Sequence, residues 1–141
     1  MNALSDEIIN EISEKLQMGY KCYYNPINEE IHVLEDLRTQ NYLEKDYWTE
    51  GIEYEFHKYI VFEAMPNFEF YKLMQEFAEN TENKKLKKHL VIALNQKQPF
   101  RNFFFQVDNS GEYRKKWFKF KSEKYAEWVR RQFAEWIRKK K

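Results

Sequence analysis

The feature that most constrains the fold of this chain is a stripe of large apolar residues near the C-terminus, spaced as on one face of a helix. Between residues 125 and 137 the intervals between successive members are 3, 1, 4, 3 and 1 residues. The members are Tyr125, Trp128, Val129, Phe133, Trp136 and Ile137. This periodicity predicts an amphipathic helix that begins at Ser122 and fills a core with its apolar face.

Three more helices are predicted between Pro66 and a polar turn at residues 108–111. Asn67 and Asn83 can cap the first two, because an asparagine side chain accepts a hydrogen bond from a backbone N–H of the first turn. Pro99 favours the start of the third, since its fixed φ suits the first helical position. Apolar residues recur at helical spacing in all three segments.

The N-terminal region reads as a helix followed by a hairpin. Ser5 can cap a helix that runs to Met18, and Gly19 can take the left-handed conformation that ends it. Two aromatic or β-branched runs, residues 20–24 and 31–34, flank a polar segment with a proline. This pattern predicts two strands joined by a turn longer than the minimal one.

A third strand is predicted from alternating apolar and polar residues over Glu53–Glu63, most clearly over residues 58–63. Residues 36–50 have no clean period. With 141 residues, 43% of them hydrophobic, the chain has the size and composition of one globular domain. We therefore expect a single α+β domain over residues 1–141, with a fraying basic tail at 138–141. A small antiparallel sheet of about three strands packs there against an N-terminal helix and three to four C-terminal amphipathic helices.

Much of the chain resembles a known family. The likeness runs from the strand at Ile60 through the segments Met74–Phe77 and Pro99–Phe103 to Trp117–Phe120 and Trp136. These segments are similar to a bacterial family described only as an uncharacterised protein family, number one-five-eight of that series. The resemblance implies a shared fold and a bacterial cytoplasmic setting. It implies no activity and no site residues.

Several classes of site are excluded by composition. The single cysteine, Cys22, excludes an internal disulfide, a CxxC redox pair and a zinc site with two cysteine ligands, and it favours a reducing cytoplasm. The three glycines are too widely spaced for a phosphate-binding loop, so no cofactor is predicted. We expect neither a signal peptide nor a membrane span, because no apolar run approaches the ~20 residues that a span needs.

The net charge of +1 hides an uneven distribution along the chain. Residues 1–80 carry 6 basic and 17 acidic side chains, a net charge of −11. Residues 81–112 carry 6 and 3, and residues 113–141 carry 12 and 3, giving +3 and +9. If the basic part keeps its own face, that face can attract an anionic partner.

The first functional hypothesis is a non-catalytic accessory or protein-interaction domain with an acidic protein as partner. RNA or single-stranded nucleic acid, bound through the basic C-terminal helices, is the alternative. The candidate contacts are Lys84, Lys85, Lys88, Arg114, Lys115, Lys139 and Lys140. Against both, lysines around a leucine stripe are typical of a solvated helix face, and pairs such as Glu127–Arg131 neutralise part of the last helix. The acidic residues there also oppose binding to an anionic membrane.

Residues 113–121 interleave aromatic and basic side chains, as surfaces that bind single-stranded nucleic acid do. Tyr113, Trp117 and Phe120 share one helical face, however. This spacing favours burial in a core over display on the surface.

The second functional hypothesis is an enzyme whose site is assembled from dispersed residues. Glu53, Glu55 and His57 would share one face of a strand and could perform acid–base chemistry, although a solvated strand face explains them better. Arg101 is flanked by phenylalanines and needs a charged partner if it is buried, for which a structural salt bridge suffices. Cys22 is a nucleophile only beside a base, and otherwise a buried structural thiol.

Overall fold

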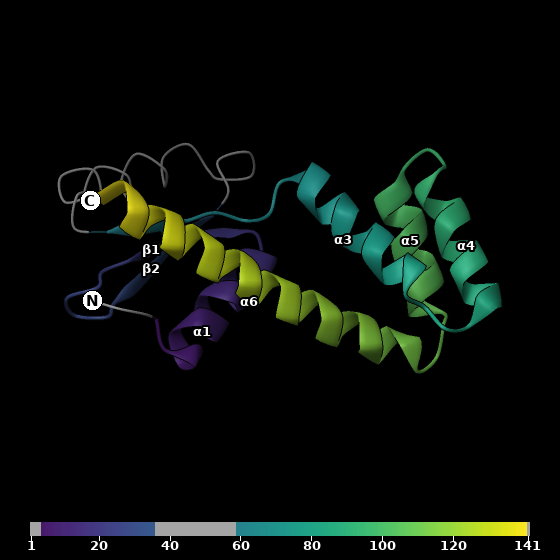
Figure 1. Ribbon diagram of the computed structural model, residues 1–141, viewed down its shortest axis with the longest axis horizontal. Helices are drawn as coiled ribbons and strands as arrows, with labels where there is room; N and C mark the ends of the chain where they lie inside the picture. The colour runs from purple at the N-terminus through teal and green to yellow at the C-terminus, as the bar shows by residue number, and fades with distance from the viewer. Residues whose placement is uncertain (1–3, 36–58, 141) are drawn as a thin grey trace. The chain divides into compact units, whose positions relative to one another are not determined.

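The computed structural model describes residues 4–35 and 59–140 (Figure 1). In chain order the elements are α1 (Asp6–Gln17), β1 (Tyr20–Tyr24), β2 (Ile31–Glu35), β3 (Ile60–Phe62), α3 (Asn67–Glu79), α4 (Lys84–Leu94), α5 (Pro99–Asp108) and α6 (Tyr113–Lys140). The described residues thus form five helices and three strands, and the strands make one antiparallel sheet. The predicted α+β fold class is confirmed.

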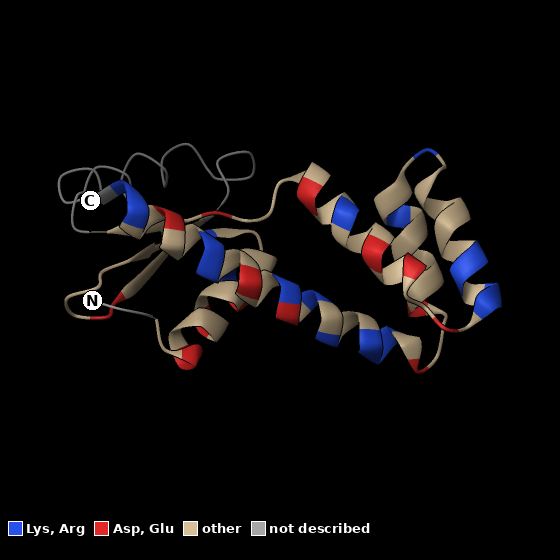
Figure 2. Ribbon diagram, viewed as in Figure 1, with Lys and Arg blue, Asp and Glu red and all other residues tan. Residues whose placement is uncertain are grey.

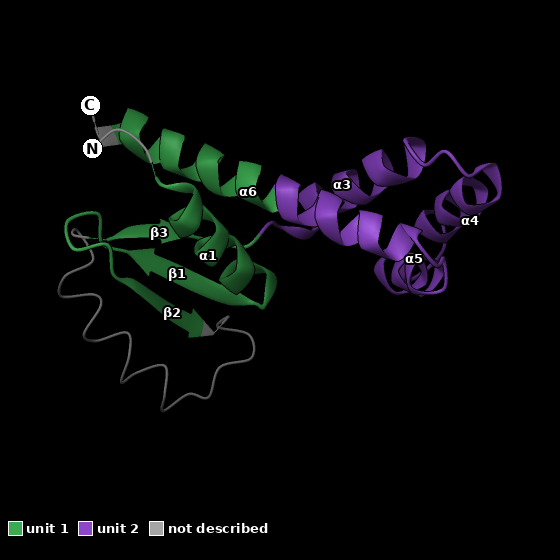
Figure 3. Cartoon of the chain, turned by 90° about the horizontal axis from the view of Figure 1, so that it is seen from below, with its two compact units in different colours: residues 1–64, 125–141 green, residues 65–124 purple. Residues whose placement is uncertain are grey.

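The chain divides into two compact units, which Figure 3 colours separately. The sheet unit comprises residues 1–64 and 125–141, and the helical unit comprises residues 65–124. Helix α6 contributes its first part to the helical unit and its second part to the sheet unit. The single domain expected from the sequence stays a prediction, because two such units can unfold in one step or in two.

The sheet has the strand order β2-β1-β3. The hairpin predicted over residues 20–34 is therefore present, and β3 pairs with the edge of β1 that β2 does not occupy. Cys22 lies opposite Phe62, and both side chains are fully buried. Val61 is 39% exposed, as alternation along a half-buried strand requires. β3 is shorter than the run predicted for it at residues 58–63.

Local capping explains where α1 begins and ends. The Ser5 hydroxyl accepts a hydrogen bond from the backbone N–H of Ile8 at 3.2 Å, as predicted. Gly19, just beyond the helix, has a φ of +96°, a conformation that a side chain would strain. The thiol of Cys22 lies 3.9 Å from the backbone carbonyl of Ile12, to which it donates, so α1 packs on the buried face of the sheet.

The helical unit is built around Trp117 of α6, which is 1% exposed. Its ring makes T-shaped contacts with Phe77 and Phe103, at centroid distances of 5.2 and 5.0 Å. The other buried members of this core are Leu73, Met74, Ala78, Leu86, Leu90, Leu94 and Val107. Tyr113 and Phe120 are partly buried against it. The interpretation of these aromatic residues as core is confirmed.

The predicted start of the last helix is wrong. α6 begins at Tyr113, and Ser122 lies exposed within it. At about 100° per residue, the apolar positions of residues 113–120 and 125–137 fall on different sides of a helical projection. The sequence pattern therefore reads as two elements, although the helix is continuous. The first apolar set enters the core of the helical unit. Of the second set, Tyr125, Val129 and Phe133 are buried in the sheet unit, and the other members are half-buried.

One of the two predicted asparagine caps is wrong as well. Asn67 is the first residue of α3, and the cap position belongs to Pro66, whose side chain makes no capping hydrogen bond. Asn83 does cap α4, because its Oδ1 accepts a hydrogen bond from the backbone N–H of Leu86 at 3.0 Å. Pro99 begins α5 as predicted.

Candidate functional site

Five of the seven basic residues predicted to contact a partner lie in the helical unit. Lys84, Lys85 and Lys88 are exposed on α4, and Arg114 and Lys115 are exposed at the start of α6. The whole unit carries 13 Lys and Arg against 7 Asp and Glu, a net charge of +6. Figure 2 shows the basic segments at the N-terminal end of α4 and along the first half of α6.

The other two predicted contacts, Lys139 and Lys140, lie at the end of α6 and belong to the sheet unit. Lys139 is exposed, and the side chain of Lys140 is outside the described part of the chain. In the same turn Arg138 pairs with Glu135 at 3.6 Å. The tail is therefore a separate basic segment and not part of the one on the helical unit.

Both basic segments of the helical unit stand at helix N-termini. The aligned peptide dipoles leave a helix N-terminus partly positive, so acidic residues stabilise it and cations do not. Neither α4 nor α6 has an acidic residue in its first turn. The lysines and arginine there add to the positive potential of the backbone instead of offsetting it.

An exposed aromatic ring lies between cations on α6. Phe118 is 38% exposed, with the Arg114 guanidinium 4.9 Å and the Lys121 ammonium 5.1 Å from its ring centroid. Arg114 also pairs with Asp108 at 3.3 Å, which ties the end of α5 to this surface. Desolvation by burial lowers the pKa of Lys121. The surface thus presents a π-face and positive charge together.

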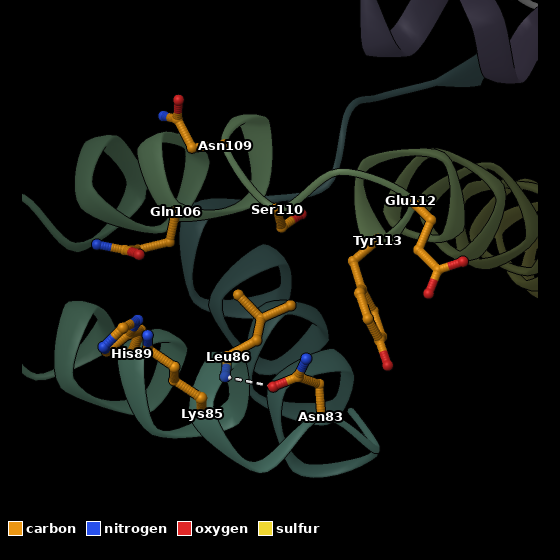
Figure 4. Close-up of a pocket in the computed structure, with 9 residues that line it drawn as sticks. All are labelled: Asn83, Lys85, Leu86, His89, Gln106, Asn109, Ser110, Glu112 and Tyr113. Carbon is orange, nitrogen blue, oxygen red and sulfur yellow. Dashed lines mark hydrogen bonds between the residues drawn. The ribbon is translucent and has the colours of Figure 1, made fainter.

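A pocket of about 290 Å³ lies where the two basic helix starts meet. It is lined by Asn83, Lys85, Leu86, His89, Gln106, Asn109, Ser110, Glu112 and Tyr113 (Figure 4). These residues come from α4, from the C-terminal half of α5 and from the turn that leads into α6. The pocket opens to solvent.

The pocket has two chemically different sides. Figure 4 shows Lys85, His89 and Gln106 on one side, and Tyr113 and Glu112 on the other. Lys85 and His89 are one helical turn apart on α4, so their side chains are neighbours. The first side offers N–H donors and a positive charge, and the second offers an aromatic ring and a carboxylate.

Of the side chains proposed for an enzyme, the structure describes Arg101 alone. Glu53, Glu55 and His57 lie outside the described residues. Arg101 is exposed and donates a hydrogen bond to Oε1 of Gln98 at 3.2 Å. The partner of Arg101 is thus a neutral amide at the start of the same helix. Because the guanidinium is exposed to water, burial, the condition under which it would need a charged partner, is not met.

Cys22 is a buried structural thiol, as one of the two interpretations held. Desolvation by burial raises its pKa from 9.0 to about 12. The thiolate, which is the reactive form, is therefore almost absent near neutral pH. No catalytic step is assigned to it.

Potential metal ligands are dispersed within residues 4–35 and 59–140, the part of the chain that the structure describes. No group of three His, Cys, Asp or Glu side chains in that part is arranged to hold a metal ion. His32 lies 3.4 Å from the Glu30 carboxylate and edge-on to the Tyr59 ring. None of the helices in that part is long and apolar enough to cross a bilayer.

Sequence reasoning found Lys85 but missed the rest of the pocket. One signal was available, because His89 follows Lys85 by four residues on a predicted helix and must share its face. The other contributors, Gln106 and Tyr113, lie 21 and 28 residues further along than Lys85. Only the packing of α4 against α5 and α6 brings them to it.

The comparisons with known proteins bear on the family alone. No curated protein and no solved structure matches the chain. A family model, described as that of an uncharacterised protein family, matches residues 4–141. Because this match covers nearly the whole chain, the protein belongs to the uncharacterised protein family UPF0158.

Proposed function

We propose that the protein is a non-catalytic binding module of the bacterial cytoplasm that binds single-stranded nucleic acid through its helical unit. The observation that carries the proposal is the pair of helix N-termini, on α4 and α6, whose first turns hold cations and no acidic residue. A reducing compartment suits the lone thiol Cys22.

The placement of these cations favours a binding role over a merely solvated face. Lysines in a first helical turn oppose the helix dipole, so they reduce helix stability. A solvated helix face needs charged side chains, but it does not need positive ones at the N-terminal end of the helix. Phosphates, in contrast, bind well at helix N-termini, where the dipole and the side chains attract them together.

Two aromatic rings among the cations, Phe118 exposed and Tyr113 half-buried, favour single-stranded nucleic acid over an acidic protein. Unpaired bases stack on such rings, while the phosphates between them contact lysine and arginine. Phe118 stands between Arg114 and Lys121, and Tyr113 carries the Lys116 ammonium 4.5 Å from its ring centroid. An acidic protein would use the charges but would not need the rings.

A protein-interaction module is the second candidate function. Four apolar side chains of the helical unit are at least 40% exposed, namely Phe68, Val91, Ile92 and Phe105. Exposed apolar surface is typical of protein-binding sites when it is contiguous. An acidic polypeptide is therefore included in the test below.

The test is fluorescence anisotropy with a labelled single-stranded RNA at ~50 and ~200 mM salt. We expect binding at the lower salt and a steep loss at the higher one, because released counterions drive the association. Replacing both Lys84 and Lys88 by Ala should lower the slope of log K against log salt by about 1.4, or ~0.7 for each phosphate contact on a single strand.

Lys139→Ala is the matched control, since it removes one exposed lysine from the sheet unit. Its effect should be smaller than that of Lys84→Ala. Absence of RNA binding at the lower salt refutes the proposal. Binding to polyglutamate without binding to RNA replaces it by the protein-interaction candidate.

A further inference from the structure

We propose that the pocket between α4, α5 and the start of α6 binds one nucleotide unit, with its phosphate at Lys85 and His89 and its base at Tyr113. This inference rests on the proposed function and deepens it, because it assigns one position along the bound strand. Glycine-rich loops have no part in it. The donors are side chains from two helices, α4 and α5.

The side of the pocket formed by α4 suits a phosphate. The Lys85 ammonium supplies charge, and the His89 ring and the Gln106 amide supply N–H donors on the same side (Figure 4). In the part of the chain that the structure describes, no carboxylate forms an ion pair with Lys85. The positive end of the α4 dipole adds to this potential.

The side formed by the start of α6 suits a base. The Tyr113 ring lines the pocket, Leu86 forms an apolar surface beside it, and Lys116 lies over the ring. A base can stack on such a ring, as bases do in single-strand-binding proteins. Glu112 also lies on this side, so it is away from the phosphate and can accept from an exocyclic amino group.

The size and openness of the pocket fit a nucleotide within a strand. Its volume of about 290 Å³ is at the small end of the range for ligand sites, roughly 300–1,000 Å³. Sites for free small molecules usually enclose most of the ligand surface. This pocket opens to solvent, which leaves a path for the backbone on both sides of the bound unit.

The experiment compares Lys85→Ala with Lys87→Ala. Both lysines are exposed on α4, but only Lys85 lines the pocket, so both variants lose the same charge from the same helix. His89→Leu tests the second phosphate donor, because leucine has no N–H. Anisotropy with labelled single-stranded RNA gives the affinity of the strand. Competition by adenosine monophosphate and by inorganic phosphate tests the single unit.

We expect Lys85→Ala and His89→Leu to weaken RNA binding about tenfold, as loss of a charge-assisted hydrogen bond does. Lys87→Ala should cost less than about threefold. Adenosine monophosphate should displace the RNA from the wild-type protein far better than inorganic phosphate does. It should lose this advantage in Lys85→Ala.

The outcomes separate this inference from the proposed function. Equal losses in Lys85→Ala and Lys87→Ala, with no displacement by the mononucleotide, overturn the pocket but leave strand binding in place. Displacement by inorganic phosphate as good as by the mononucleotide overturns the assignment of a base to Tyr113. If calorimetry detects mononucleotide binding that Lys85→Ala abolishes while RNA does not bind, the pocket stands with a free nucleotide as ligand, and the proposed function fails.

Discussion

Replacing Trp117 by Ala should remove most of the stability of the helical unit. The side chain is 1% exposed and contacts the rings of Phe70, Phe77 and Phe103 at centroid distances of 6.0, 5.2 and 5.0 Å. All three contacts are T-shaped, the geometry that ring quadrupoles favour. The substitution therefore removes both buried area and three favourable ring pairs.

The expected loss lies at the upper end of the range for such substitutions. Truncating a buried tryptophan to alanine costs about 3–5 kcal/mol. Each aromatic pair contributes about 0.5–1.5 kcal/mol beyond its buried area, so three pairs move the estimate to ~5 kcal/mol. A domain of ordinary stability has only about 5–15 kcal/mol in total. A loss of ~5 kcal/mol is a third or more of that total, so the urea midpoint of the variant should fall markedly.

Phe118→Ala is the matched control, because the neighbouring ring is 38% exposed. It should cost about 1 kcal/mol or less, which includes its contacts with Arg114 and Lys121. Urea titrations followed by far-UV circular dichroism measure both free energies of unfolding without depending on the fluorescence of Trp117. Losses equal within ~1 kcal/mol would refute the packing described for the helical core.

Three further predictions concern Cys22 and Lys84. Burial raises the pKa of Cys22 to about 12, so at pH 8 about one molecule in ten thousand carries the thiolate. Cys22 should therefore resist a thiol reagent at pH 8 in the folded protein and react rapidly in urea. Rapid labelling of the folded protein would contradict its burial. Since the pKa of Cys22 is higher in the folded protein than in the unfolded chain, the thiol contributes its full stability below about pH 9 and loses it as the pH rises toward 12. The free energy of unfolding of Cys22→Ala should lack this decline with pH. Lys84→Glu should raise the free energy of unfolding by up to ~1 kcal/mol, because an acidic residue in the first turn of α4 interacts favourably with the helix dipole. The same variant should weaken RNA binding in anisotropy. A loss of both stability and binding would show that the dipole reasoning is wrong.

Local chemistry made much of the fold predictable. The Ser5 cap, the left-handed Gly19 and the start of α5 at Pro99 each follow from one residue type and its neighbours. The hairpin also followed, because aromatic or β-branched runs flank a polar turn over residues 20–34. Such features depend on a few consecutive residues, so a single sequence suffices to find them.

The boundary placed at Ser122 shows where local patterns mislead. Trp117 and Val129 are among the most buried residues of α6, and they are twelve residues apart. At about 100° per residue, this leaves ~120° between them around the helix axis. A change of apolar face usually means a new element, but here one helix supplies two separate cores. The periodicity of apolar residues shows which face of a helix is buried. It cannot show that the elements packed against the helix change along its length.

Local sequence also misleads about where charge gathers in the folded chain. Counting along the sequence assigned the largest excess, +9, to residues 113–141. The structure divides that segment at residue 125 and joins its first part to the lysines of α4, which gives a helical unit of net charge +6. The sheet unit carries 11 basic and 16 acidic residues, a net charge of −5, even though it includes the basic tail. A long-range field therefore attracts a polyanion to the helical unit and disfavours it at the tail. Within the helical unit, the dipoles of α4 and α6 add to the side-chain charge at the rim of one pocket. The position of the proposed site therefore depends on where these two helices begin and not on the number of lysines in the chain.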